Sequence, residues 1–497
     1  MSAKIAIFCY NPHKIVTYFT YFKRSKKTQV IDKFSYLCII LGVLYSQGLT
    51  PKAIMMDKIT TRDKLILRLQ EISEKGILDA EYADRSENMH RLFMYPAMMV
   101  PATQSAIVQA FSDILPSNTY AIDPFMGSGT SLLSCIEFGL NVFGQDINPF
   151  AVLLSKAKTT VYDVSKLRTS LENIRNRILQ DTGTTIDITF SSIDKWFTKD
   201  AQISFSKIRR AINAEECIDY RNFFWVLMSE AIRVGSNDRT STFKLHRRSS
   251  EELQHRNIDV IQKFLSIATS GISDYEMFYN KLKKEHNSSE LNFRGKAEIT
   301  WGNSQLEINS KRKFNLLLSS PPYGDNHTTV TYGQTSYLPL QWIPFNDIEC
   351  PYEYLRTTQE IDRQSLGGKI DNKCLEEKRV VLFKKTKHLK DFYLNIPDEE
   401  KSKYKKTIAF IADFEECLKN IVEVMQKDAY YIWTIGNRFV GGREIPNAEV
   451  LQDLMEYYGI NLFFKAERQI FNKKQACKNN HSRTMEKEQI LIFHRKE

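Results

Sequence analysis

A glycine-rich turn between an expected strand and an expected helix limits the folds open to this 497-residue chain more than any other feature. Residues 119–122 (TYAI) are typical of a strand end, and residues 131–137 (SLLSCIE) of a helix with an apolar face. The connecting residues 123–130 read DPFMGSGT, in which Gly127 and Gly129 allow the backbone to approach a ligand closely. A strand, a glycine-rich turn and a helix make up the first unit of a doubly wound nucleotide-binding sheet.

The next expected strand ends in a carboxylate. Residues 142–149 read VFGQDINP, so Asp146 stands at the tip of this strand, where an acid suits the diol of a ribose. The turn at 123–130 lacks the third glycine of a dinucleotide fingerprint, which argues against NAD, and it lacks the Gly-Lys-Ser/Thr of a phosphate loop. A lone Gly-x-Gly is weak evidence. Its weight here comes from the strand before it, the acid after it and a second motif further along the chain.

That second motif is a rigid turn, Ser-Ser-Pro-Pro-Tyr at residues 319–323, which follows the apolar run FNLLL at 314–318. Each proline fixes φ and removes an N–H, and Ser320 is pushed to an extended backbone by the proline after it. Carbonyl oxygens and the Ser320 hydroxyl are left as acceptors for the hydrogens of a bound amine. Tyr323 supplies a ring face for a flat base. The alternative interpretation is a strand-ending loop with an incidental proline pair.

The two motifs together resemble the cofactor and catalytic motifs of S-adenosylmethionine-dependent amino-methyltransferases of DNA, which methylate N4 of cytosine or N6 of adenine. The serine at the head of Pro-Pro-Tyr is similar to the cytosine-N4 branch, since aspartate or asparagine is more usual in the adenine branch. The resemblance extends to residues 90–101 (HRLFMYPAMMVP), 430–438 (YYIWTIGNR) and 489–493 (QILIF). It implies a catalytic fold that covers residues 85–160, 295–345 and 400–497.

The implied fold is α/β, a Rossmann-like doubly wound methyltransferase sheet that is mostly parallel and carries two insertions. We expect six segments along the chain: an unassigned extension (1–55), the cofactor-binding half of the fold (56–160), a mostly helical insertion (161–295), the catalytic strand and turn (296–345), a charged insertion (346–400) and the C-terminal half of the fold (401–497). The extension is interpreted as a loose segment or as sequence translated from a wrong start codon, because MMDK at residues 55–58 would make an ordinary start. Apolar spacing predicts helices at 59–75, 167–179, 223–232 and 405–426, and strands at 297–301 and 429–435.

The resemblance also implies roles for individual residues. Catalysis is expected from the rigid turn, at Ser320, Pro321, Pro322 and Tyr323. Cofactor binding is expected from Tyr95, Pro96, Asp123, Phe125, Gly127, Gly129, Thr130, Asp146 and Asn303. In this scheme Asp146 holds the ribose of S-adenosylmethionine and Asn303 meets its adenine. The target base must be flipped out of duplex DNA, because its amine lies inside the helix. No Pro-Cys dipeptide occurs, so covalent attack on the ring carbon is not expected.

Positive charge indicates the partner. The net charge of +10 suits a polyanion, although a solvated basic surface without a ligand would give the same balance. Residues 239–250 (RTSTFKLHRRSS) mix hydroxyls with cations around one phenylalanine, a composition that suits phosphate contacts. Its candidate DNA-binding residues are Arg239, Lys244, Arg247 and Arg248. A second basic stretch lies at 378–388, and either insertion could read the target sequence. Both stretches could also be exposed basic surface.

Cysteine usage and hydropathy exclude other classes. Eight cysteines are scattered without a CxxC pair, so neither a zinc site nor a disulfide scaffold is indicated, and we expect no metal. Free thiols imply a reducing compartment, which we take to be the cytoplasm. The apolar run at residues 37–44 is too short to span a bilayer, and no membrane association is expected.

The predicted function is therefore site-specific methylation of the N4 amine of cytosine in duplex DNA, as the protective arm of a restriction-modification system with a cognate restriction endonuclease. Methylation of adenine N6 and methylation of an RNA amine are the alternatives. An RNA enzyme would normally carry a recognisable RNA-binding module, and none is seen. A non-enzymatic nucleic-acid binder on the same sheet is disfavoured by the intact motif residues Asp123, Gly127, Gly129, Ser320 and Tyr323.

Overall fold

The computed structural model of the chain describes residues 60–81, 89–116, 118–285, 296–326, 330–470 and 485–495. The chain divides into two compact units, Met1–Lys64 and Leu65–Glu497. The expected extension at 1–55 lies outside the described residues. The helix expected at 59–75 is α3 (Thr61–Glu74), which runs from the first unit into the second. The fold described below is that of the second unit.

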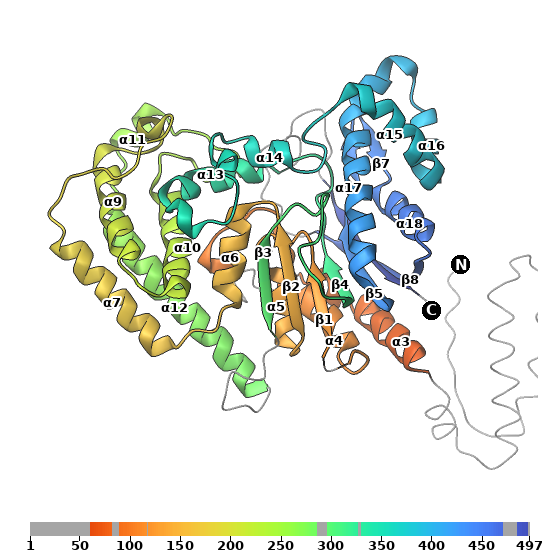
Figure 1. Cartoon of the computed structure of the whole chain (residues 1–497), viewed down its shortest axis with the longest axis horizontal. Helices are drawn as coiled ribbons and strands as arrows, with labels where there is room; N and C mark the ends of the chain where they lie inside the picture. The colour runs from red at the N-terminus through yellow and green to blue at the C-terminus, as the bar shows by residue number, and fades with distance from the viewer. Residues whose placement is uncertain are drawn as a thin grey trace, which may run out of the picture. The chain divides into compact units, whose positions relative to one another are not determined.

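A seven-stranded sheet built from described residues forms the centre of this unit, with the order β3-β2-β1-β4-β5-β9-β8 (Figure 1). Its strands are β1 (Tyr120–Asp123), β2 (Asn141–Asp146), β3 (Ala297–Trp301), β4 (Phe314–Ser319), β5 (Met425–Ile435), β8 (Asn461–Gln469) and β9 (Lys487–His494). The pairs among β1 to β5 are parallel, and β9 runs antiparallel to β5 and β8. This confirms the expected Rossmann-like, mostly parallel methyltransferase sheet.

The direction of strand succession reverses at the centre of the sheet. β2 and then β3 follow β1 on one side, whereas β4 and then β5 follow it on the other. Connections after β1 and β4 therefore leave in opposite directions, and a crevice opens at the carboxyl ends of these two strands. Asp123 ends β1 and Ser319 ends β4, so both motifs found in the sequence begin at this switch point.

Alternating apolar residues give the sheet one core on each face, as expected when successive side chains of a strand point to opposite sides. Leu316 and Leu318 belong to one core, and Leu317 belongs to the other. The helices α4 (Pro101–Phe111), α5 (Thr130–Glu137) and α6 (Pro149–Thr159) contribute to the first core, and α17 (Lys405–Val424) and α18 (Asn447–Tyr457) to the second. The motif turns lie between helices on both faces.

The first insertion is a helical layer beside α6 (Figure 1). It contains α7 (Val164–Gln180), α8 (Ile193–Trp196), α9 (Lys199–Asn213), α10 (Ile218–Gly235), α11 (Ser250–Gln254) and α12 (Val260–Glu285). α7 shows why such segments fold: Asp163 accepts hydrogen bonds from the first-turn amides of Ser165 and Lys166, and the apolar positions recur every three or four residues. The helices expected at 167–179 and 223–232 are α7 and α10.

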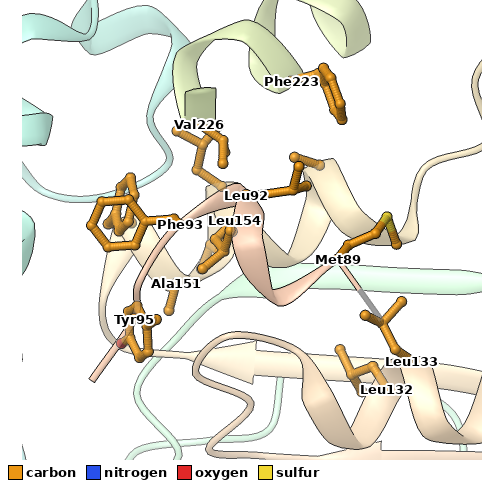
Figure 2. Close-up of a cluster of buried hydrophobic side chains, with 14 of the residues drawn as sticks. Met89, Leu92, Phe93, Tyr95, Leu132, Leu133, Ala151, Leu154, Phe223 and Val226 are labelled. Carbon is orange, nitrogen blue, oxygen red and sulfur yellow. The ribbon is translucent and has the colours of Figure 1, made fainter. Parts of the chain in front are cut away.

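A buried apolar cluster joins this insertion to the sheet. Figure 2 shows Met89, Leu92 and Phe93 of the segment before α4 meeting side chains of α5, α6 and α10. Phe93 and Phe150 of α6 meet edge to face with ring centroids 4.5 Å apart. Because these side chains are fully buried, the segment that ends in Tyr95 is fixed against α6 at the edge of the crevice.

Part of the second insertion lies at the other end of the sheet, beside α17, whereas α14 (Glu360–Gln364) packs against α13 (Tyr332–Trp342) (Figure 1). Its longer helices are α15 (Asn372–Lys385) and α16 (Lys387–Leu394). The shorter elements of the unit are α13 (Tyr332–Trp342), α14 (Glu360–Gln364), the 3-10 turns η2 (Ile77–Asp79), η3 (His90–Leu92), η5 (Phe345–Asp347), η6 (Tyr352–Leu355) and η7 (Asp398–Tyr404), and the hairpin β6 (Arg438–Val440) and β7 (Arg443–Ile445). No helix in the described ranges has both the length and the apolar character needed to cross a bilayer.

Candidate active site

A solvent-open cleft with about 850 Å³ of empty space lies at the carboxyl ends of the parallel strands. Among the expected site residues, those that line it are Tyr95, Pro96, Phe125, Gly127, Thr130, Asp146, Asn303, Ser320 and Pro322. Four other expected residues, all within the described ranges, do not line it: Asp123, Gly129, Pro321 and Tyr323. The glycine-rich turn and the Ser-Pro-Pro-Tyr turn therefore share one cleft, although some of their residues do not line it.

The glycine-rich turn reaches the cleft through Gly127. Its φ of +49° is a left-handed conformation, and an added Cβ would lie 3.4 Å from Cε1 of Tyr95. The Gly127 amide donates a hydrogen bond of 2.8 Å to Oδ2 of Asp146, so the turn is fixed to the end of β2. Gly129 has a different role, since an added Cβ would lie 2.9 Å from Oγ of Ser155 on α6. Gly129 allows α6 to pack against the turn.

Two polar side chains of α6 hold the turn from behind. Oγ of Ser155 donates to the Gly127 carbonyl at 3.1 Å, and Nζ of Lys158 donates to the Ser128 carbonyl at 2.9 Å. Lys158 is fully buried, and burial lowers its pKa to about 7. Lys158 was not among the expected site residues. The sequence feature that could have indicated its burial is its position next to the inward-facing Ala157, on a helix that is apolar on most sides.

Asp123 lies beneath the cleft. Its Oδ1 accepts from the Phe125 amide at 3.0 Å and from Oγ of Ser319 at 2.6 Å, and its Oδ2 accepts from Oγ of Ser131. Burial raises the pKa of this carboxyl to about 6, and the three hydrogen bonds oppose that rise. Its bonds to Phe125 and Ser319 connect the turn after β1 to the end of β4. The structure thus places Asp123 as a support for both motifs.

Asp146 lies in the cleft wall at the end of β2. Its Oδ2 accepts from Gly127, and its Oδ1 accepts from the Asn148 amide at 2.8 Å. Burial raises the pKa of Asp146 to about 6. Asn148 also caps α6 and uses its side-chain amide to donate to the hydroxyls of Tyr95, at 3.0 Å, and Ser336, at 2.8 Å. One polar network therefore positions the acid, the glycine turn and Tyr95.

The far wall of the cleft combines the end of β3 with the second insertion. Asn303 lines the cleft, and its Oδ1 accepts from the Gln305 amide at 3.0 Å. Ile361, Ser365 and Leu366, in and just after α14, line the same space. They were not among the expected site residues, because α14 lies about 40 residues beyond the Ser-Pro-Pro-Tyr turn and has no motif.

The Ser-Pro-Pro-Tyr turn presents Ser320 to the cleft, whereas Tyr323 does not line it. Oγ of Ser320 lies 3.0 Å from the Tyr323 hydroxyl, which donates to Oε1 of Glu488 on β9 at 3.0 Å. Burial raises the pKa of Tyr323 well above its ordinary value, and the Glu488 carboxylate adds to this. The backbone carbonyl of Tyr323 accepts from the side-chain amide of Asn447 at 3.1 Å. Glu488 was not among the expected site residues, because nothing in its local sequence distinguishes it.

The basic loop at 239–248 is fixed to the first turn of α13. The Leu245 amide donates to Oε1 of Gln334 at 3.0 Å, and Oγ of Thr335 donates to the Phe243 carbonyl at 3.2 Å. Tyr332, in the same helical turn, lines the cleft and stacks on Tyr95 with ring centroids 5.7 Å apart. The loop is thus attached next to the cleft.

Four cations of this loop were expected to contact DNA. Lys244 and Arg247 are exposed, although Nε of Arg247 donates to the Lys195 carbonyl at 3.2 Å. Arg248 is half-buried and donates to the Arg239 carbonyl at 3.1 Å. Arg239 and Arg248 each approach Glu252 at 4.0 Å. Lys244 and Arg247 are therefore the better placed pair for an external anion.

Comparison with known proteins identifies the family. No family model matches the chain. It is 32% identical over 450 residues to Type II methyltransferase M.MvaI of Kocuria varians, and this match covers 87% of the chain and 96% of that protein. The chain belongs to the Type II methyltransferases. A second methyltransferase of this type, M.MjaII of Methanocaldococcus jannaschii, is 33% identical over 94 residues, which are 19% of this chain and 17% of that protein. The methyltransferase expectation is confirmed at the level of the family.

Proposed function

We propose that this Type II methyltransferase transfers a methyl group from S-adenosylmethionine to the exocyclic N4 amine of cytosine, at a specific site in duplex DNA. The observation that carries the proposal is that Ser320 of the Ser-Pro-Pro-Tyr turn lines the same cleft as Gly127 and Asp146. An amine acceptor and a nucleoside-binding wall thus face one space. In this proposal the enzyme is the protective arm of a restriction-modification system, and a cognate endonuclease is its partner.

The cleft residues fit S-adenosylmethionine, which would supply an electrophilic methyl group bonded to a sulfonium. A carboxylate has about four lone-pair sites, and the two backbone amides on Asp146 leave acceptor capacity for a ribose diol. The missing side chain at Gly127 leaves space beside Tyr95. We assign the adenine to the wall that contains Phe125 and Asn303.

Catalysis would then depend on the hydrogen bonds that the protein accepts from the target amine. The lone pair of the cytosine amine is delocalised into the ring, and a hydrogen bond accepted by Ser320 Oγ, which lines the cleft, would localise it on nitrogen. The second proposed acceptor is the carbonyl of the adjacent Pro321, which does not itself line the cleft. The nitrogen forms the new N–C bond, the electron pair of the broken S–C bond stays on sulfur, and the amine releases one proton to solvent. Alignment of the two groups supplies most of the gain in rate.

The target base would have to leave the duplex to reach Ser320. Tyr323, whose hydroxyl lies 3.0 Å from Ser320 Oγ, would stack on the flipped base, a contact worth about 1–3 kcal/mol by analogy with single-stranded nucleic-acid binding. Adenine N6 methylation requires the same acceptors, and Ser320 at the head of the motif is the one feature that favours cytosine.

The basic loop of the first insertion is the better candidate for DNA contact. Its Lys244 and Arg247 are exposed next to the cleft. In the second insertion, by contrast, Lys378 pairs with Asp413 at 3.3 Å and Lys385 pairs with Glu415 at 2.5 Å. Those two cations serve internal contacts between α15 and α17, so they contribute less to an outward positive surface.

Nucleoside mass spectrometry tests the proposal. The purified protein is incubated with S-adenosylmethionine and either duplex DNA or RNA, and the nucleosides are then quantified. N4-methylcytosine in DNA is the expected product. N6-methyladenine would keep the mechanism and overturn the choice of base, and methylated RNA beside unmodified DNA would overturn the substrate. Long-read sequencing of DNA from cells that express the protein would give the modified site.

A further inference from the structure

A carboxylate on β9, the strand between β5 and the edge strand β8, ends the hydrogen-bond chain of the catalytic turn. Glu488 lies on β9, and its Oε1 accepts the hydrogen of the Tyr323 hydroxyl at 3.0 Å. Its Oε2 accepts from Nε of Arg468 on β8 at 2.7 Å. Both side chains of this ion pair are largely buried, with exposed fractions of 16% for Glu488 and 8% for Arg468.

The chemistry of these groups determines the direction of the chain. An ionised carboxylate only accepts hydrogen bonds, and a tyrosine hydroxyl has one hydrogen to give. Since Tyr323 gives that hydrogen to Glu488, its oxygen must accept from Ser320 Oγ, which lies 3.0 Å away. The Ser320 hydrogen is then directed toward Tyr323. Its lone pairs are left for a donor in the cleft.

The neighbours of Glu488 favour this arrangement. Arg468 is its direct partner in the β8–β9 register, and Nη1 of Arg468 also donates to Oγ of Thr103 at 3.2 Å. The guanidinium thus occupies one carboxylate oxygen and leaves the other for Tyr323. A largely buried ion pair adds little net stability by itself, because removing both charges from water offsets their attraction. A role in orienting the catalytic turn accounts for its position.

We propose that Glu488 is a positioning residue that makes Ser320 Oγ a hydrogen-bond acceptor toward the target amine, acting through the Tyr323 hydroxyl. This inference rests on the proposed function, because it requires an amine donor in the cleft. A serine hydroxyl that donated into the cleft would compete for the nitrogen lone pair. The direction of the chain therefore affects the methyl-transfer step.

Glu488→Gln reverses the chain with little change in shape. Arg468 can only donate, so the Gln oxygen pairs with it and the Gln NH2 faces Tyr323. The Tyr323 hydroxyl then donates to Ser320, and the Ser320 hydrogen is directed into the cleft. We expect the single-turnover rate of cytosine methylation to fall by about tenfold or more, as for loss of a charge-assisted hydrogen bond. Affinities for S-adenosylmethionine and DNA should stay within about twofold.

A double variant separates positioning from structural support. Tyr323→Phe removes the hydroxyl, so adding Glu488→Gln to it should leave the rate unchanged, because the relay is already absent. If Glu488 only supported the structure, Glu488→Gln would lower the rate both in the wild type and in the Tyr323→Phe variant. Glu467→Gln is the matched control, since Glu467 lies on β8 and pairs with Lys487 at the surface at 2.5 Å. It should behave as the wild type.

Each outcome decides the proposal. An unchanged rate in Glu488→Gln, or the same loss in the Tyr323→Phe background, would overturn it. If Glu488→Gln does not fold, Tyr323→Phe breaks the same chain without touching the Arg468–Glu488 pair, and a wild-type rate for that variant would also overturn it. A wild-type enzyme that forms no methylcytosine would overturn the proposed function, and this inference with it. If the wild type does form methylcytosine, an unexpected result with the variants overturns only the role of Glu488 and leaves the proposed function intact.

Discussion

The carboxylate of Asp123, at the end of β1, accepts a hydrogen bond of 2.6 Å from the hydroxyl of Ser319, at the end of β4. This contact spans the point where the strand order reverses. On one side the chain continues into the glycine-rich turn, and on the other it continues into Ser-Pro-Pro-Tyr. A single buried acid therefore sets the separation of the two motifs, which makes alignment of donor and acceptor a property of the sheet rather than of loops.

The raised pKa of Asp123 makes the stability of the fold depend on pH. Its carboxyl has a pKa of about 6 in the folded protein and about 4 when unfolded, so the folded state favours the protonated form. This stabilisation is complete below pH 4 and is lost as the pH rises through 6, an effect of about 3 kcal/mol. Asp123→Asn does not titrate. Between pH 4 and pH 7, urea unfolding should therefore show the wild type losing about 2 kcal/mol of stability relative to the variant. An equal difference at both pH values would contradict this role for burial.

We expect cofactor binding to require a glycine at position 127. A side chain there would extend toward Tyr95 and strain a left-handed backbone. Gly127→Val should weaken S-adenosylmethionine binding by at least about tenfold in calorimetry. Gly459→Val is the matched control, because Gly459 has a φ of +73° but no atom within 4 Å of an added Cβ. Equal affinity of the folded Gly127→Val variant and the wild type would reject the assignment.

Lys158 supports the cofactor turn through the Ser128 carbonyl. Lys158→Met keeps the length of the side chain and removes the donor, so the turn loses one anchor. We expect S-adenosylmethionine to bind about fivefold more weakly, as for loss of one hydrogen bond. Lys156→Met on the same helix is the control, because Lys156 pairs with Glu349 at 2.5 Å away from the turn. Identical affinities for the two variants would show that the Ser128 contact has no part in binding.

The DNA-contact assignment has an electrostatic test. Arg247→Ala should weaken binding to all duplex sequences and lower the slope of log affinity against log salt by about one. Arg379→Ala in the second insertion is the comparison, since Arg379 forms an ion pair with Glu376 on α15. It should leave the slope unchanged. If Arg379→Ala lowered the slope and Arg247→Ala did not, the DNA contact would be assigned to the second insertion instead.

Local motifs predicted the centre of this fold, and long-range pairing explains what they missed. The turns at Gly127 and Ser320 were recognisable because glycine, proline and the neighbouring apolar runs act over a few residues. Glu488 acquires its role from Tyr323, which lies 165 positions earlier in the chain. The strand β8 was not expected at all. Its sequence, NLFFKAERQ, does not alternate between apolar and polar residues, so it lacks the period of two that is typical of a strand.

The sequence also could not predict which way each side chain of a motif points. Asp123 and Gly129 belong to the cofactor motif, yet they stand behind the cleft wall. Their surroundings, Ser319 for Asp123 and Ser155 for Gly129, come from other elements. Motif membership therefore predicted which turns meet at the cleft, and the packing of α6 and β4 decided which of their residues line it.

The catalytic turn gives the most direct test of function. Tyr323→Ala removes the ring and the hydroxyl on which Ser320 depends, while the cleft residues Gly127 and Asp146 are untouched. DNA methylation should therefore fall by at least about a hundredfold, the combined effect of lost stacking and lost orientation, with S-adenosylmethionine affinity unchanged. Ser320→Ala should reduce the rate less, because the Pro321 carbonyl remains as an acceptor. Single-turnover assays with nucleoside mass spectrometry measure both effects. If Ser320→Ala were the more damaging change, the serine hydroxyl would be the main acceptor of the amine, and the assignment of the Pro321 carbonyl would have to be abandoned.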